Sequence, residues 1–186
     1  SHEGIIVMPD DVVPGTLAKD YYNIKSDYVL EVDITPNRAD ACSHYGVARD
    51  LYAWLVQNGY EATLKRPSVE AFAVDNHELN IDVVVENTEA CPRYAGVVVR
   101  NVTVKESPEW LQNKLKAIGL RPINNIVDIT NYILHAYGQP MHCFDADKIK
   151  GGKIVVKTVA EGTPFVTLDG VEHKLSERDL MICNAE

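Results

Sequence analysis

The first part of the chain has two apolar runs followed by a change of period. Residues 4–8 end at a proline and residues 28–34 end at Thr-Pro, so both are predicted to be short β-strands. From residue 40 the apolar positions recur three and four apart, which predicts a helix over residues 40–58 that stops at Gly59. Residues 79–85 alternate again and predict another strand.

Two helices are predicted in the middle of the chain, after a strand over residues 94–104 that is rich in β-branched side chains. Ser107 supplies a helix N-cap and Pro108 a first-turn proline, and a glycine closes this helix at position 119. The second helix is predicted over residues 125–137, with Gly138 as its stop.

Beyond residue 150 the apolar pattern returns to a period of two. Residues 153–158 predict a strand, and residues 164–175 predict a hairpin around Asp169-Gly170, a residue pair preferred in type I′ turns. Residues 180–183 begin a further strand. The sequence therefore predicts an α+β fold made of two mixed α/β parts with largely antiparallel sheets.

Charge changes near a polar connector at residues 61–77. Residues 1–86 hold 6 Lys and Arg against 15 Asp and Glu, whereas residues 87–186 hold 12 against 12, in a chain whose net charge is -9. We therefore predict a partial N-terminal domain over residues 1–86 and the first part of a second domain over residues 87–186. Because phosphate binding depends on Lys and Arg, any nucleic-acid contact is expected on the second part.

The sequence shows no sign of a membrane span or a secretory signal. No apolar run approaches the roughly 18 to 20 residues that a span requires, and the start of the chain lacks the basic and apolar regions of a signal peptide. The cytoplasm is therefore the expected compartment, with no membrane partner. Four cysteines lie far apart without a C-x-x-C pair, so we expect buried, small apolar residues. These are Cys42, Cys91, Cys143 and Cys183.

The chain lacks four general enzyme motifs: the phosphate loop, G-x-G-x-x-G, G-x-S-x-G and H-E-x-x-H. Polar residues instead gather in residues 121–132 and 138–145, where they either tie turns and helix ends or line a pocket. For Asp128 and Asp145 the tie is the first interpretation. Arg121 and His142 fit a pocket better, because they follow helix stops in irregular segments.

A metal site is not predicted. His135, His142 and Cys143 are the nearest group of His and Cys residues, and their spacing across a glycine matches no common ligand pattern.

Several segments resemble the beta-subunit family of bacterial phenylalanine-tRNA ligases. They are residues 31–40 (EVDITPNRAD), 46–50 (GVARD), 91–94 (CPRY), 127–132 (VDITNY) and 138–145 (GQPMHCFD). They occur in the family's order and at its spacing across nearly the whole chain. Together they form a far more specific signal than any one of them alone.

The resemblance implies a class II aminoacyl-tRNA synthetase, assembled as an α2β2 heterotetramer, that attaches phenylalanine to its tRNA with ATP and Mg²⁺ in the alpha subunit. It implies no cofactor in this region. Residues 87–186 would begin the editing domain, which hydrolyses tyrosine wrongly esterified to the phenylalanine tRNA. The expected partners are thus the alpha subunit and that tRNA.

By the same resemblance, Arg121, Thr130, Asn131 and His142 match positions that line the editing pocket. Arg121 and His142 would hold the tRNA 3′ end or orient water, and Thr130 and Asn131 would contact the aminoacyl group. No covalent nucleophile is assigned, because a positioned water and a stabilised oxyanion suffice for a labile ester.

The chain is also expected to be an excerpt of the family's sequence. It stops before the family's glycine-rich segment and the acidic residue that reads the tyrosine hydroxyl, so we expect an incomplete pocket and no editing by the isolated chain. The alternative is a module without catalysis, either a subunit-interface scaffold or an RNA-binding platform. Convergence of the four pocket residues on one open cleft would favour editing over the scaffold.

Overall fold

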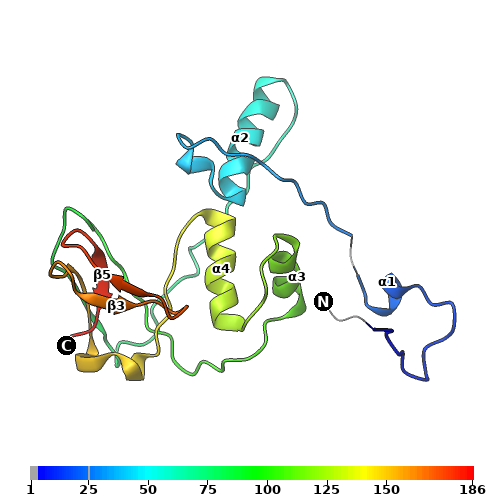
Figure 1. Ribbon diagram of the computed structural model, residues 1–186. Helices are drawn as coiled ribbons and strands as arrows, with labels where there is room; N and C mark the ends of the chain where they lie inside the picture. The colour runs from blue at the N-terminus through cyan, green and yellow to red at the C-terminus, as the bar shows by residue number, and fades with distance from the viewer. Residues whose placement is uncertain (1–3, 25) are drawn as a thin grey trace.

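A computed structural model describes residues 4–24 and 26–186 (Figure 1). Residues 1–3, which belong to the start of the chain considered for a signal peptide, lie outside the described residues. The helices are α1 (Ala18–Tyr21), α2 (His44–Gln57), α3 (Glu109–Ala117) and α4 (Asn125–Tyr137), with 3₁₀ turns η1 (Ala39–Ala41), η2 (Ala146–Lys148) and η3 (Lys150–Gly152). The strands are β1 (Asp82–Val85), β2 (Lys153–Thr158), β3 (Pro164–Val166), β4 (Glu172–Lys174) and β5 (Leu180–Cys183).

The three long helices were predicted from sequence and are confirmed. α2 starts where the Ser43 hydroxyl accepts a hydrogen bond from Gly46 N at 2.9 Å. α4 has the predicted bounds, and Gly138 takes the left-handed conformation that ends it, with φ of 74°. The predicted N-cap of α3 was wrong: Pro108 is the N-cap, because the Ser107 hydroxyl donates to Asp128 instead.

A three-stranded sheet has the order β1-β2-β5. β1 runs parallel to β2, and β5 runs antiparallel to it, so β2 is central. Its Ile154, Val155 and Val156 are buried, which explains their apolar, β-branched character. β3 and β4 form the predicted hairpin, with Gly170 at φ of 82° in its turn. The α+β class is confirmed.

Three predicted strands were wrong. Residues 4–8, 28–34 and 94–104 form no strand, and of residues 79–85 only β1 does. The backbone groups of a strand need a neighbouring strand, and these segments have none in the described part of the chain. Their apolar side chains remain open to solvent, as Leu30 at 83% and Val99 at 71% show.

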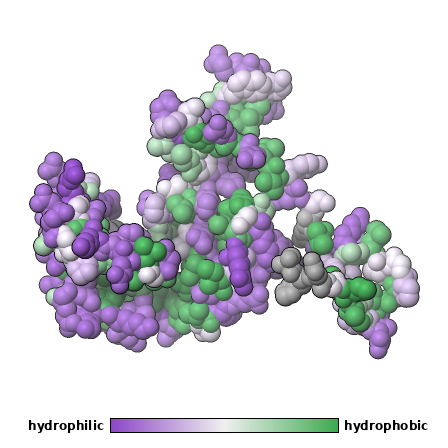
Figure 2. Space-filling view, in the orientation of Figure 1, coloured by the Kyte–Doolittle hydropathy of each residue, from purple (hydrophilic) through white to green (hydrophobic). Residues whose placement is uncertain are grey.

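Much of the surface of the molecule is exposed to solvent and not buried in a core. Its accessible surface is 15950 Å², whereas a compact monomer of this mass exposes roughly 8,900 Å². Figure 1 shows the reason, since α1 lies apart from the α3–α4 pair, and Figure 2 shows apolar side chains at the surface there. The prediction of buried cysteines was wrong: Cys42 and Cys143 are exposed, and the other two are partly exposed. Their exposure follows from the same open packing.

Helix α4 lies between α3 and α2 (Figure 1). Trp110 of α3 meets Tyr132 edge to face, with ring centroids 5.7 Å apart. Three residues further along α4, the Nδ1 atom of His44 lies 2.9 Å from the carbonyl oxygen of His135. The two parts predicted from charge thus touch here and also through the β1–β2 pairing, and the boundary near residue 86 stays a prediction.

Candidate functional site

Asn124 and Asn125, at the start of α4, have purely structural tasks. The Asn124 side chain accepts from the backbone N–H groups of Ile126 and Val127, both at 3.0 Å, and so caps the helix. The Asn125 side chain accepts from Lys105 N at 3.0 Å and donates to Thr103 O at 3.1 Å. It therefore holds the end of the preceding extended segment against α4.

Asp128 is also structural, and it is fully buried. Its Oδ2 accepts from the Ser107 hydroxyl at 2.5 Å, and its Oδ1 accepts from Ile123 N at 2.9 Å. A buried carboxylate is costly unless it is hydrogen-bonded, and both oxygens are. The first interpretation of Asp128 agrees with this geometry. Sequence reasoning missed Ser107 as its partner, because a serine before a helix usually caps it.

Arg121 lies in the short linker between α3 and α4. On one side Leu120 N donates to Leu115 O at 2.9 Å, and on the other Ile123 N donates to Asp128. Only Arg121 and Pro122 lie between these anchors. The guanidinium is exposed and has no hydrogen bond or ion pair within residues 4–24 and 26–186. The backbone of Arg121 is therefore anchored, while its guanidinium N–H groups remain available to a ligand.

Thr130 and Asn131 are neighbours on α4 and half-buried. The Thr130 hydroxyl donates to Val127 O at 2.7 Å and keeps its lone pairs for another donor. Thr130 lies about 160° round the helix from Asp128, whereas Asn131 follows Asp128 by about one turn on the same side. Asn131 makes no side-chain hydrogen bond to any described residue.

His142 follows the end of α4 in the irregular segment between Gly138 and η2. Its exposed ring stacks on Phe144, with centroids 6.1 Å apart and planes 18° apart. Among the described residues its ring nitrogens have no hydrogen-bond partner. Asp145, by contrast, caps η2 by accepting from Asp147 N at 3.2 Å, in agreement with its first interpretation as a helix-end tie.

The four predicted pocket residues are arranged along α4. Arg121 precedes this 13-residue helix and His142 follows it, so the helix between them spans roughly 20 Å. No hydrogen bond or ion pair in the described ranges joins any two of the four side chains. Their convergence on one cleft stays a prediction.

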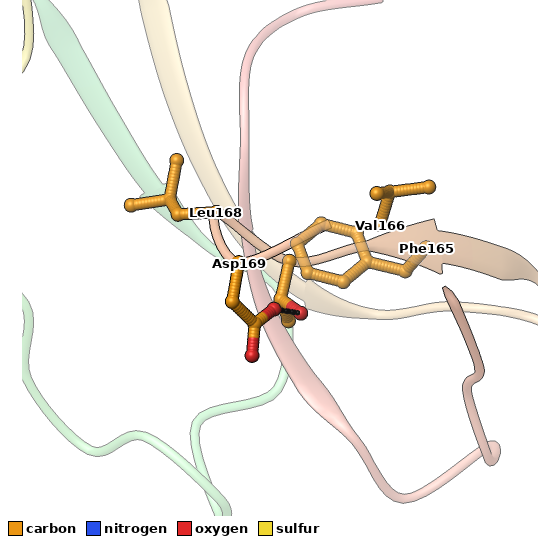
Figure 3. A pocket seen from close by; sticks show the side chains of 5 residues that line it. Phe165, Val166, Leu168 and Asp169 are labelled. Carbon is orange, nitrogen blue, oxygen red and sulfur yellow. Dashed lines mark hydrogen bonds between the residues drawn. The ribbon is translucent and has the colours of Figure 1, made fainter. Parts of the chain in front are cut away.

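The hollows beside the β3–β4 hairpin and beside α2 are not lined by any of the four residues. Figure 3 shows the larger, of about 500 Å³, which is lined by Phe165 to Asp169 at the β3–β4 hairpin. The hydroxyl of Thr167 and the N–H of Val171 donate to Asp169 and hold the pKa of its carboxyl below the ordinary value. The Asp169-Gly170 pair predicted a hairpin here but did not indicate a hollow.

The second hollow, of about 270 Å³, lies beside η1 and α2 and includes Arg38 and Asp50. Arg38 Nε contacts Asp40 Oδ1 at 2.9 Å, and its Nη2 contacts Asp50 Oδ1 at 2.7 Å. These two carboxylates, Asp40 foremost, raise the pKa of the guanidinium, and Arg38 lowers the pKa of Asp40. The family segment at residues 31–40 therefore ties a turn to α2.

Metal and membrane features are lacking in the described part of the molecule. Within residues 4–24 and 26–186, no three His, Cys, Asp or Glu side chains gather in a group that fits a metal ion. None of the helices described is both long and apolar enough to cross a bilayer.

Comparison with known proteins identifies relatives along the whole chain. It is 81% identical over 186 residues to the phenylalanine-tRNA ligase beta subunit of Bacteroides fragilis, covering 100% of this chain and 23% of that relative. It is 79% identical over 185 residues to the same subunit of Bacteroides thetaiotaomicron, with 100% and 23% covered. For Porphyromonas gingivalis the identity is 61% over 185 residues, with 100% and 22% covered.

The chain thus spans about 23% of the length of these two Bacteroides relatives. The resemblance predicted from the sequence motifs is confirmed. Residues 90–186 match the model of the B3/4 domain, which is more than half of the chain. The chain belongs to the B3/4 domain family, and along its whole length it is similar to part of phenylalanine-tRNA ligase beta subunits.

Proposed function

We propose that this chain is the part of a phenylalanine-tRNA ligase beta subunit that hydrolyses tyrosine wrongly esterified to the phenylalanine tRNA. A pocket that accepts phenylalanine rejects an analogue with one added hydroxyl only weakly, so a second, hydrolytic site improves fidelity. The similarity to beta subunits along the whole chain supports the subunit, and the division of polar side chains around α4 into bonded and unbonded groups supports the site.

The observation that carries the proposal is that some polar side chains around α4 are hydrogen-bonded within the fold and others are not. The side chains of Asn124, Asn125 and Asp128 each make two hydrogen bonds that hold the fold. Arg121 and His142 are exposed, and their side chains bond no described residue. Polar groups that the fold does not use are available to a ligand, and an arginine fork suits phosphate or carboxylate oxygens.

The proposed reaction is attack of water on the ester carbonyl. Water adds to the carbonyl carbon, the negative charge moves to the carbonyl oxygen, and the bond to the ribose oxygen then breaks. The ribose oxygen takes up one proton of the attacking water, the other passes to solvent, and tyrosine leaves as its carboxylate. Arg121 and His142 hold the tRNA 3′ end or orient the water, and Thr130 and Asn131 contact the aminoacyl group.

The remaining features of the whole enzyme are part of the same proposal. The beta subunit assembles with an alpha subunit as α2β2 in the cytoplasm, and the alpha subunit attaches phenylalanine with ATP and Mg²⁺. The described residues of this chain do not fit a metal, so no step here involves one. Residues 87–186, whose charges balance, carry the tRNA contact in preference to the acidic first part.

The test uses the full heterotetramer with Arg121→Ala or His142→Ala in the beta subunit. We expect release of labelled tyrosine from mischarged tRNA to slow tenfold or more, about 1.4 kcal/mol in the barrier, while phenylalanine activation stays near normal. Synthesis and editing use different sites in this proposal, which is why only one activity falls.

Matched controls are Arg178→Ala and His173→Ala, which remove exposed side chains of the same types far along the chain, in or beside the strands β4 and β5. Both should leave deacylation unchanged. Unchanged deacylation in the Arg121 and His142 variants would favour the scaffold without catalysis. Equal losses of deacylation and activation would indicate defective folding or assembly.

A further inference from the structure

Asp128 connects three segments through a single carboxylate. It belongs to α4, its Oδ2 accepts from Ser107 just before α3, and its Oδ1 accepts from Ile123 in the linker. The Ser107 carbonyl in turn accepts from Gln112 Nε2 at 2.8 Å, so this bond also reaches into α3. No cation pairs with the carboxylate in the described ranges. These polar bonds are therefore what compensates for its burial.

The bond to Ile123 has a specific consequence for Arg121. The linker has one backbone anchor at Leu120 and the other at Ile123, and the second depends on a side chain, that of Asp128. Ile123 is 67% exposed, so the residue is anchored to the fold through its backbone N–H and not through its side chain. Pro122 has a fixed φ and no N–H, which further limits the span. The direction in which Arg121 leaves the backbone is thus set from both ends.

We propose that Asp128 is a positioning residue that acts through Ile123 N to aim Arg121 at the ester substrate of the editing reaction. It does not touch the tRNA or the water. This inference rests on the proposed function, because the orientation of Arg121 matters only if Arg121 takes part in the editing reaction. Small displacements of a positioned group can slow a reaction on the order of a hundredfold, so a hydrogen bond two residues away has a measurable effect.

The experiment is a double-mutant cycle in the full heterotetramer, with tyrosyl-tRNA deacylation as the readout. Asp128→Asn keeps the size of the side chain and replaces one carboxylate oxygen by an amide. We expect it to slow deacylation on the order of tenfold in the native background and less than twofold in the Arg121→Ala background. A merely structural residue would give the same loss in both backgrounds.

A second variant covers the case in which Asp128→Asn does not assemble. Pro122→Gly frees the two-residue span and leaves the buried carboxylate in place, and we expect the same dependence on Arg121. Ser107→Ala is the stability control, since it removes the other bond of Asp128 and leaves the Ile123 bond intact. It should lower the unfolding temperature while changing deacylation less than twofold.

The outcomes separate the two proposals. If Arg121→Ala slows deacylation while the losses from Asp128→Asn and Pro122→Gly add fully to it, the positioning role is overturned and the proposed function stands. If Arg121→Ala has no effect on deacylation, the positioning role is overturned, and if His142→Ala has none either, the proposed function is overturned with it. Non-additive losses in either variant, with Ser107→Ala near normal, support both.

Discussion

The α3–α4 pair and the extended segment at residues 94–104 are neighbours in the chain and differ sharply in how they are held. The pair buries Leu111 and Leu115 and satisfies Asp128 through two hydrogen bonds. The segment carries an equally apolar pattern, yet Val97 and Val99 are 65% and 71% exposed. Among the described residues, its one hydrogen bond to the pair is near its end, from the Asn125 side chain to the Thr103 carbonyl oxygen.

The difference follows from where each element finds its hydrogen bonds. A helix satisfies its backbone within itself and needs a partner only for one apolar face. A strand needs a second strand for its backbone before its side chains can pack. An apolar pattern is therefore sufficient to predict α3 and α4, and insufficient to predict a sheet at residues 94–104.

The largest expected effect is a difference in unfolding free energy between a substitution in the α3–α4 pair and one in residues 94–104. Leu115→Ala removes a side chain that is 1% exposed, and we expect it to lower the free energy of unfolding of this chain by about 3 kcal/mol. Val99→Ala removes a side chain that is 71% exposed and should cost less than about 0.5 kcal/mol. Urea unfolding followed by circular dichroism measures both, and similar costs would show that the segment is packed in solution.

A smaller effect should come from the tie between the two regions. Asn125→Ala removes the bonds to Lys105 N and Thr103 O, and we expect a loss of about 1 kcal/mol with faster amide exchange at Lys105. The control is Asn113→Ala on the exposed face of α3, where alanine favours the helix and stability should be unchanged or slightly higher. Unaltered exchange at Lys105 would mean that the tie is not formed.

The smallest effect concerns Asp27, whose Oδ2 accepts from Lys114 Nζ of α3 at 3.0 Å. This hydrogen bond, with that from Tyr28 N, holds the pKa of Asp27 below its ordinary value of 3.8. A lowered carboxyl pKa means that the contact is fully present above pH 3.8 and is lost as the pH falls through the lowered pKa.

Carbon-detected NMR titration of Asp27 should therefore give a pKa below 3.8, and Lys114→Met should raise it. Lys116→Met is the matched control on the same helix, since Lys116 Nζ donates to Gln112 Oε1 instead. A titration of Asp27 that Lys114→Met leaves unchanged would exclude the contact between this segment and α3. Salt should weaken the contact, because both side chains are exposed.

Local signals account for what the sequence predicted correctly. α4 has the predicted bounds because Asn124 and Gly138 mark its ends chemically, and the β3–β4 hairpin follows from Asp169-Gly170. The exposure of the cysteines and of residues 28–34 could not be predicted, because burial depends on what covers a segment and not on its composition. For the site, the sequence already favoured a structural tie for Asp128 and a pocket for Arg121, and the structure adds Ser107 and the Ile123 N–H as the partners of Asp128.

The pairing of β1 with β2 constrains the order in which the chain can fold. Val84 lies beside Val155, and both α3 and α4 are in the stretch between them. Closing so long a loop is slow, whereas each helix forms from local contacts. During synthesis on the ribosome the helices can thus form and dock before β2 has emerged, and the sheet is completed after the helical pair is in place.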